Sequence, residues 1–201
     1  DICHAHFGNI GRKWSFVDDL PDQGPLVTTV YGMDVSGLVH PGRYRWYEPL
    51  WSKCSLAIGT SQYIRAQMIT LGCPEERSIR HPIGIDIDAF EFDPTAFACE
   101  EPLRIASVAR YVEQKGLKYG IEAVAKCRER GLDVEFRVAG EGELRPDLEL
   151  QIRDLGVEDS VHLIGWQTQE EVRELLGDAH LFMLPSLTAY DGNTEGQALV
   201  L

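Results

Sequence analysis

Short apolar runs alternate with segments of helical periodicity in the second half of the chain. Apolar side chains recur every three to four residues in 117–125, which places them on one face of a helix. Similar segments lie at 144–155 and 172–176, and Gly131 and Gly156 end the first two. The apolar runs of strand length are residues 103–109, 134–139, 161–164 and 179–184. This alternation predicts β–α–β units with a parallel sheet covered on both faces.

The first half alternates in the same way, though less regularly. Ser61 is a predicted N-cap for a helix that runs to Leu71. The predicted strands, including one that opens the chain and runs into a loop, are residues 1–8, 26–31, 55–59 and 79–81. Residues 90–102, rich in acids with two prolines, have the composition of a linker. We therefore expect two α/β domains, 1–93 and 94–201.

Composition is that of a globular protein, with 44% hydrophobic and 25% charged residues. The chain has 19 Lys and Arg against 32 Asp and Glu, a net charge of −13. Such acidity argues against general nucleic-acid binding, which depends on clustered cations. Residues 1–90 carry 8 cations and 10 anions, whereas residues 91–201 carry 11 and 22. If either half approaches an anionic membrane, we expect it to be the first.

Cysteine usage and chain ends bear on location. The cysteines are odd in number and form no C-x-x-C motif, which indicates reduced thiols in the cytoplasm; they are Cys3, Cys54, Cys73, Cys99 and Cys127. No run of about 18 apolar residues is present to span a membrane. The chain starts without Met and stops in an apolar run at Leu201, so we expect a fragment cut at both ends.

Two clusters in the first half have competing interpretations. Arg12 and Lys13 precede two aromatic residues and could contact a lipid surface or an acceptor phosphate, or could simply be solvated. His4 and His6 alternate on the first predicted strand near Cys3. Zinc needs three or four ligands, and no second His/Cys cluster supplies them, so we expect no metal site.

The first candidate binding loop follows the strand at 103–109. It carries Arg110 and Lys115 before a helix that begins near Gly116. Ligands of parallel α/β sheets bind at the carboxyl ends of strands, and a helix N-terminus attracts anions. Arginine grips a phosphate bidentately and lysine acts as a point charge. The two cations therefore suit a diphosphate; two solvated loop cations are the alternative.

Two further strand-end loops are weaker candidates. Gly140 and Gly142 could allow a backbone to approach a ligand closely, or could form an ordinary tight turn. In the loop after 179–184, Thr194 is a candidate N-cap for a helix that begins at Glu195. A carboxylate there stays ionised and can accept hydrogen bonds from sugar hydroxyls, or it is only a favourable helix charge.

In their order along the chain, these motifs resemble the retaining GT-B glycosyltransferases of family GT4. The matching segments are 110 with 115–116, 139–142, 161–165, 185–196, 1–8, 28–34, 60–61, 71–72 and 82–90. Loop 190–196 looks most like the branch that builds exopolysaccharides such as colanic acid. The resemblance implies two Rossmann-like domains with parallel sheets, both incomplete. The first would be the acceptor side and the second would bind a nucleotide sugar.

The resemblance also implies roles for residues of the second domain. Arg110 and Lys115 would hold the donor diphosphate, and Glu195 would contact the transferred sugar. Glu195 opens the family's E-x7-E signature, whose second glutamate would fall two residues past Leu201. The remaining donor-site positions are Gly116, Gly140, Gly142, Gly165, Trp166 and Gly196, with Gly165 and Trp166 near the nucleotide base.

In the first domain, the resemblance places His6, Gly8, Tyr31 and Asp34 on the acceptor side of the cleft. Tyr31 stands where the family commonly has a histidine that approaches the donor sugar. Tyrosine can donate and accept a hydrogen bond but does not titrate near neutral pH. A positional role and a plain buried tyrosine both remain open.

We therefore expect a retaining, hexosyl-type glycosyltransferase that needs no metal and no cofactor beyond its nucleotide-diphosphate sugar. Its acceptor would be a glycan or lipid-linked sugar, and it would be cytoplasmic, with peripheral contact to the inner face of the membrane as an option. The truncated chain is expected to be inactive. One alternative is a nucleotide-sugar epimerase on the same architecture, and another is a non-catalytic fragment that binds nucleotide sugars. A nicotinamide oxidoreductase is disfavoured because G-x-G-x-x-G is absent.

Overall fold

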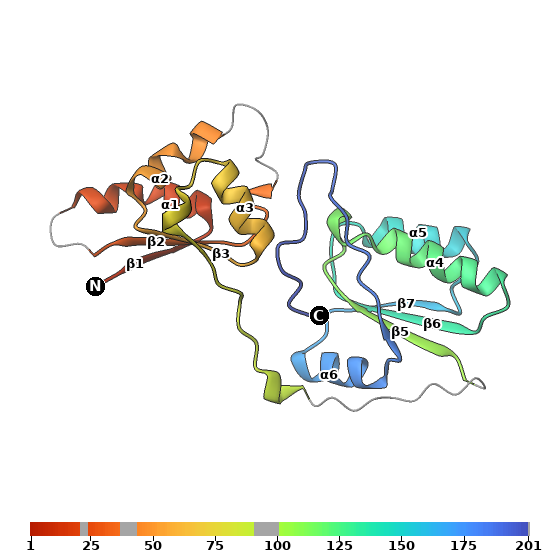
Figure 1. The fold of residues 1–201 in the computed structure, drawn as a ribbon. Coiled ribbons are helices and arrows are strands. Elements are labelled where there is room, and N and C mark those ends of the chain that lie inside the picture. The colour runs from red at the N-terminus through yellow and green to blue at the C-terminus, as the bar shows by residue number, and fades with distance from the viewer. Residues whose placement is uncertain (21–23, 37–43, 91–100, 201) are drawn as a thin grey trace. The chain divides into compact units, whose positions relative to one another are not determined.

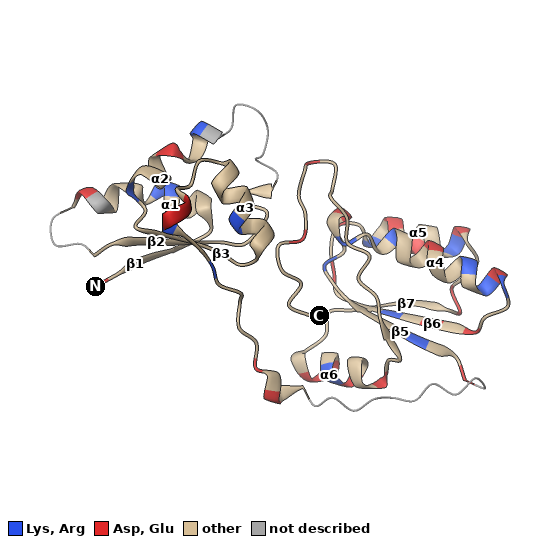
Figure 2. Ribbon diagram, viewed as in Figure 1, with Lys and Arg blue, Asp and Glu red and all other residues tan. Residues whose placement is uncertain are grey.

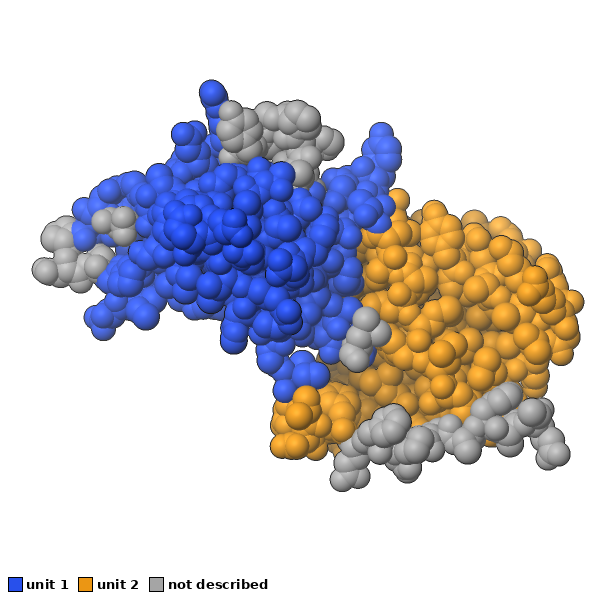
Figure 3. All heavy atoms as spheres, in the orientation of Figure 1, with its two compact units in different colours: residues 1–85, 188–201 blue, residues 86–187 orange. Residues whose placement is uncertain are grey.

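The computed structural model describes residues 1–20, 24–36, 44–90 and 101–200, which form two α/β units (Figure 1; Figure 3). By their contacts, residues 1–85 group with 188–201 in the first unit, and residues 86–187 form the second. The domain boundary predicted near residue 93 lies outside the described residues, as does most of the predicted linker.

The strands are β1 (Cys3–His6), β2 (Leu26–Val30), β3 (Leu56–Gly59), β4 (Ser78–Arg80), β5 (Leu103–Val108), β6 (Val134–Ala139), β7 (Val161–Gly165) and β8 (Leu181–Phe182). The α-helices are α1 (Gly8–Lys13), α2 (Glu48–Lys53), α3 (Gln62–Thr70), α4 (Leu117–Glu129), α5 (Arg145–Asp154) and α6 (Gln169–Asp178). None of the helices described here is long and apolar enough to cross a bilayer.

The first unit is a parallel sheet in the order β1-β2-β3-β4. Because the strands follow one another in sequence, right-handed crossovers place the connecting helices α1, α2 and α3 on one face of the sheet (Figure 1). The predicted N-cap is confirmed: the Ser61 hydroxyl accepts a hydrogen bond from the Ile64 N–H at 3.2 Å.

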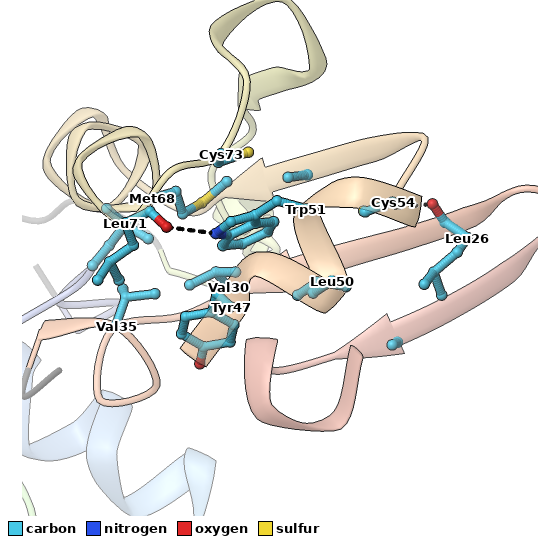
Figure 4. Close-up of a cluster of buried hydrophobic side chains, with 13 residues drawn as sticks. Leu26, Val30, Val35, Tyr47, Leu50, Trp51, Cys54, Met68, Leu71 and Cys73 are labelled. Atoms are coloured by element: carbon cyan, nitrogen blue, oxygen red, sulfur yellow. Dashed lines mark hydrogen bonds between the residues drawn. The ribbon is translucent and has the colours of Figure 1, made fainter. Parts of the chain in front are cut away.

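A buried cluster between these helices and the sheet forms the core of the first unit (Figure 4). Tyr47, Leu50 and Met68 are fully buried in it. The indole N–H of Trp51 donates to the Leu71 carbonyl at 2.9 Å, so the ring ties α2 to the end of α3 (Figure 4). The one polar atom of this large side chain is thereby satisfied inside an apolar core.

The second unit is a parallel sheet in the order β7-β6-β5-β8, with helices on both faces. Ile121, Val124 and Leu148 pack α4 and α5 on one face, while Leu175 packs α6 on the other (Figure 1). The outer surfaces of α4 and α5 carry charges of both signs (Figure 2). The predicted parallel sheet with two covered faces is therefore confirmed.

Two features of the elements differ from expectation. The strand predicted at 179–184 is reduced to β8, because only Leu181 and Phe182 pair with β5. Helices α1 and α2 were not predicted, since each has only six residues and no apolar periodicity, and α1 also contains Gly8 and Gly11. Gly11 allows α1 to lie close to the sheet: a Cβ there would come within 2.5 Å of the Thr28 hydroxyl oxygen.

Candidate functional site

The loops that follow β5, β6 and β7 meet at one edge of the second sheet. All strands are parallel, so their carboxyl ends lie at the same edge. Tyr111 N–H donates to the Glu141 carbonyl at 2.9 Å, and Gly140 N–H donates to the Gly165 carbonyl at 2.7 Å. The structure thus brings together three loops that the sequence singled out separately.

Gly140 and Gly142 are required by this packing. Gly140 has a φ of 135°, and a Cβ there would collide with the Ala109 carbonyl oxygen. A Cβ on Gly142 would come within 2.5 Å of the Tyr111 carbonyl oxygen. These two glycines therefore allow a close backbone approach, as predicted, and the backbone they approach is that of the loop at Ala109–Tyr111.

Two residues that the sequence did not single out stabilise the same edge. Tyr111 is fully buried, and its hydroxyl donates to the Val138 carbonyl at 2.8 Å. Burial raises the pKa of Tyr111 to about 12, so the hydroxyl remains a donor. Arg145 forms ion pairs with Glu149 at 2.9 Å and Glu141 at 2.7 Å; the hydrogen bond to Glu149, and then the charge of Glu141, raise the pKa of its guanidinium. The sequence signal that could have revealed Tyr111 was its position next to the predicted cation Arg110, at the end of a predicted strand.

The two predicted cations both lie in the segment that leads from β5 to α4. Arg110 is exposed and has no ion pair with any residue that the structure describes, whereas Lys115 is half-buried at the end of the 3-10 turn Glu113–Lys115. Gly116 follows with a φ of 63°, and a Cβ there would collide with the Pro185 carbonyl oxygen. No side chain caps helix α4; the Tyr119 N–H donates to the Gly116 carbonyl at 2.9 Å, and the N–H groups before it are not taken by a capping side chain.

The end of β7 adds an aromatic surface. Gly165 has a φ of 79° and is followed by Trp166, whose side chain is 72% exposed. The indole therefore lies largely in solvent, next to Gly165, whose carbonyl bonds the Gly140 loop. Such a ring can stack on a planar heterocycle.

The helix predicted to begin at Glu195 is wrong. Residues 191–200 form turns and bends without a helix, and the Thr194 N–H donates to the Ser36 hydroxyl at 3.4 Å. The Gln197 side chain makes two bonds to the backbone of Ile83, accepting from its N–H at 2.9 Å and donating to its carbonyl at 3.2 Å. These contacts tie the segment to Ser36 and Ile83, and isolated segments of fewer than two turns do not sustain a helix.

Asp34 anchors two strand-end loops of the first unit. Its buried carboxylate accepts hydrogen bonds from the N–H groups of Gly8 at 2.7 Å, Tyr31 at 3.1 Å and Gly32 at 2.8 Å. These loops follow β1 and β2. The carboxylate is thus committed to the backbone, and it fixes the positions of the side chains that the two loops carry.

His6 and Tyr31 lie on those loops and contact each other. His6 Nδ1 lies 2.5 Å from the Tyr31 hydroxyl oxygen. Tyr31 is only partly buried, and burial and the nearby Asp34 carboxylate raise its pKa. The backbone of Gly196 lies against the Tyr31 carbonyl, so close that a Cβ on Gly196 would collide with it. Three predicted positions, His6, Tyr31 and Gly196, are thus neighbours within the first unit.

No group of three or more His, Cys, Asp or Glu side chains in residues 1–20, 24–36, 44–90 and 101–200 is arranged to hold a metal ion. His4, singled out with His6, donates or accepts a hydrogen bond at the Thr29 hydroxyl at 2.8 Å and stacks on the His6 ring at 4.5 Å.

Comparisons with known proteins all point to glycosyltransferases. The profile of the family described as "Glycosyl transferases group 1" matches residues 90–201. The chain is 36% identical over 203 residues to the amylovoran biosynthesis glycosyltransferase AmsK of Erwinia amylovora, and 32% identical over 203 residues to the putative colanic acid biosynthesis glycosyltransferase WcaL of Escherichia coli (strain K12). Each alignment covers 100% of this chain and 50% of the relative. The chain thus spans about half the length of the curated relatives it matches.

Among solved structures, Anabaena Alr3699/HepE in complex with UDP and glucose superimposes with a TM-score of 0.77 at 20% identity. The superposition covers 94% of this chain and 53% of that one. The likeness, together with two parallel α/β units, establishes a GT-B fold built from two Rossmann-like units.

The loop packing predicts a graded cost for two glycine substitutions. Gly131→Ala should lower the free energy of unfolding by about 1–2 kcal/mol, because its φ of 81° disfavours alanine although the space is open. Gly140→Ala should cost at least about 3 kcal/mol, since a collision with the Ala109 carbonyl adds to the backbone strain. Urea unfolding followed by circular dichroism measures both, and equal losses would contradict the packing argument.

Proposed function

Because the chain belongs to the group 1 glycosyl transferases, we propose that the protein transfers a sugar from a nucleotide-diphosphate sugar to a hydroxyl on a glycan or lipid-linked acceptor. The names of the relatives AmsK and WcaL support a role in the synthesis of an exopolysaccharide. The complexes of HepE with UDP and UDP-glucose support a uridine nucleotide as the first donor to test.

The observation that carries this proposal is the pairing of two cations with an uncapped helix start at the carboxyl edge of the second sheet. When the sugar leaves, negative charge develops on the diphosphate. Arg110, Lys115 and the first N–H groups of α4 would stabilise that charge through donors already in place. No metal is required for this step, and we propose that the reaction uses none.

Further roles follow from the resemblance to family GT4. Transfer would retain the anomeric configuration and move a hexosyl group. Glu195 would contact the transferred sugar, and Trp166 would lie against the nucleotide base, where its exposure suits stacking. We place the domain boundary near residue 93, with the donor side in 94–201 and the acceptor side in 1–93, and the protein in the cytoplasm.

The diphosphate site is tested by removing each cation from the full-length protein. Arg110→Ala and Lys115→Ala should each weaken UDP binding by at least about tenfold, because a charge-assisted hydrogen bond contributes roughly 1.5–3 kcal/mol. Isothermal titration calorimetry measures the affinity. Lys126→Ala, an exposed lysine farther along α4, is the matched control and should bind UDP normally. Unchanged affinity in both site variants would remove the basis of the proposal.

Metal independence is tested by chelation. UDP binding and sugar transfer by the full-length protein should survive dialysis against EDTA, because protein cations and helix N–H groups neutralise the diphosphate. Sugar transfer is measured as the release of UDP from UDP-glucose in the presence of a saccharide acceptor. Loss of activity that manganese restores would show that the diphosphate needs a divalent ion.

We also propose a peripheral membrane contact through an aromatic patch on the first unit, defined as Trp14, Phe16, Leu20 and Trp46. Trp14 and Phe16 are each 50% exposed, and their rings stack at 5.6 Å. The Arg12 guanidinium lies 4.6 Å from the centroid of the Trp46 ring. Exposed indoles beside Arg and Lys suit the interface of an anionic bilayer.

The membrane contact predicts a defined loss of vesicle binding. The double substitution Trp14→Ser with Phe16→Ser should reduce co-sedimentation with phosphatidylcholine–phosphatidylglycerol vesicles by at least about tenfold, given the apolar area of two aromatic rings. Tyr63→Ser removes a similarly exposed aromatic residue from α3 and serves as control. Equal binding by all three proteins, or none by the unmodified protein, would rule out this patch as the contact.

A further inference from the structure

A groove runs between helices α4 and α5, which pack side by side on one face of the second sheet (Figure 1). Each helix returns from the end of one parallel strand to the start of the next, so the two helices run in the same direction. The groove contains a hollow of about 470 Å³ toward the ends of the helices and one of about 410 Å³ toward their starts. Asp147 and Gln151 line both hollows, so the groove is continuous. We call it the α4–α5 groove and define it by Glu122, Glu129, Asp147, Leu150, Asp154 and Leu155.

Apolar side chains in this groove are open to solvent. Leu150 is 50% exposed and Leu155 is 41% exposed, and both line the larger hollow. Ala125 faces them from α4, and its small side chain keeps the hollow wide. The Gln151 amide donates to the Lys118 carbonyl at 3.0 Å and thereby fastens α5 to α4. Two exposed leucines gathered in one preformed hollow suit contact with an apolar surface of a partner.

Carboxylates line the same groove at a regular spacing. Glu122 and Glu129 lie seven residues apart on α4, and Asp147 and Asp154 lie seven residues apart on α5. Seven residues make about two helical turns, or about 10.5 Å along the axis, so both walls carry two acids at the same interval. Of the nine described residues that line the larger hollow, four are acidic and only Lys126 is basic.

The carboxylates of the groove are not neutralised within the second unit. Among the residues that the structure describes, three of them form no ion pair: Glu129, Asp147 and Asp154. The fourth, Glu122, accepts a hydrogen bond from the Gln151 amide at 3.5 Å. Elsewhere in the unit, Arg145 pairs with Glu141 and Glu149. The groove therefore keeps a negative potential that favours a cationic partner.

We propose that the α4–α5 groove binds a basic amphipathic helix of another protein. Such a helix would lay its apolar face on Leu150 and Leu155 and place lysines or arginines, seven residues apart, beside the acids of each wall. Helix α4 has 13 residues and is about 20 Å long, which suits a bound helix of about four turns. The negative groove repels nucleic acid and an anionic bilayer. A second copy of this chain, with a net charge of −13, is disfavoured for the same reason.

The first test uses a synthetic peptide and the full-length protein. The labelled peptide has about 18 residues, with leucines on one helical face and lysines seven residues apart on both sides of that face. A scrambled peptide of the same composition is the control. Fluorescence anisotropy should show saturable binding of the amphipathic peptide and none of the scrambled one, because only the former presents both patterns together.

Charge reversal tests whether the peptide lies in the groove. Asp147→Lys with Asp154→Lys should weaken binding of the lysine peptide by at least about tenfold, since attractive contacts become repulsive. The same variant should bind a peptide with glutamates in place of the lysines. Glu158→Lys with Asp159→Lys makes the same change in net charge at exposed positions that do not line the groove, and it should bind the lysine peptide normally. Leu150→Ser should weaken binding about three- to tenfold through loss of apolar contact.

UDP binding and thermal unfolding of each variant show whether the fold is intact; if the charge-reversed variant is misfolded, Leu150→Ser decides. Equal binding of the scrambled peptide, no binding by the unmodified protein, or unchanged binding by the groove variants would overturn the proposal. A photo-crosslinking amino acid in place of Leu150, in the cells that make the protein, should link a segment of another protein. Mass spectrometry should identify that segment as a basic amphipathic helix. A link to this chain itself, to a segment without this pattern, or to nothing would also overturn the proposal.

Discussion

Every strand pair in the two sheets is parallel, and the remaining architecture depends on this. A parallel connection must cross back over the sheet, so a helix or loop covers it between successive strands. The loop after each strand is then delivered to one common edge. In the second unit that edge gathers Arg110, Lys115, Gly140 and Gly165, which are widely separated in sequence. The functional residues meet because the strands share a direction, not because the residues are near one another along the chain.

The second unit could be predicted well because its elements show their period clearly. Strands β5, β6 and β7 are short, mostly apolar segments, and α4 and α5 carry one apolar stripe each. The first unit was harder to predict. Its helices α1 and α2 have six residues each, which is too short for a periodic pattern. Their positions follow from tertiary packing, such as the approach of Gly11 to Thr28, which a linear pattern does not contain.

The candidate site shows the same division. The sequence correctly predicted that Arg110, Gly140 and Gly165 lie at the ends of strands, because those strands could be recognised from their apolar residues. It did not reveal that Asp34 is committed to three backbone N–H groups, that Tyr111 is buried beneath the loops, or that His6 contacts Tyr31. Each of these contacts joins residues at least 25 positions apart or depends on a loop conformation. The helix expected at Glu195 failed for a related reason: a capping pattern is a local signal, and long-range bonds from Gln197 to Ile83 outweigh it.

The bond between Gln197 and Ile83 also has a consequence for the order of folding. It joins residues 114 positions apart and closes a chain segment that contains the whole second unit. On the ribosome, residues 1–85 emerge long before residues 188–200. The first unit therefore lacks its last segment until the second unit has been synthesised. The entropic cost of closing so long a loop falls once the second unit has folded, because folding leaves a shorter flexible segment to close. The second unit is continuous in sequence, so it can fold first. Its folding then brings the segment with Gln197 closer to Ile83.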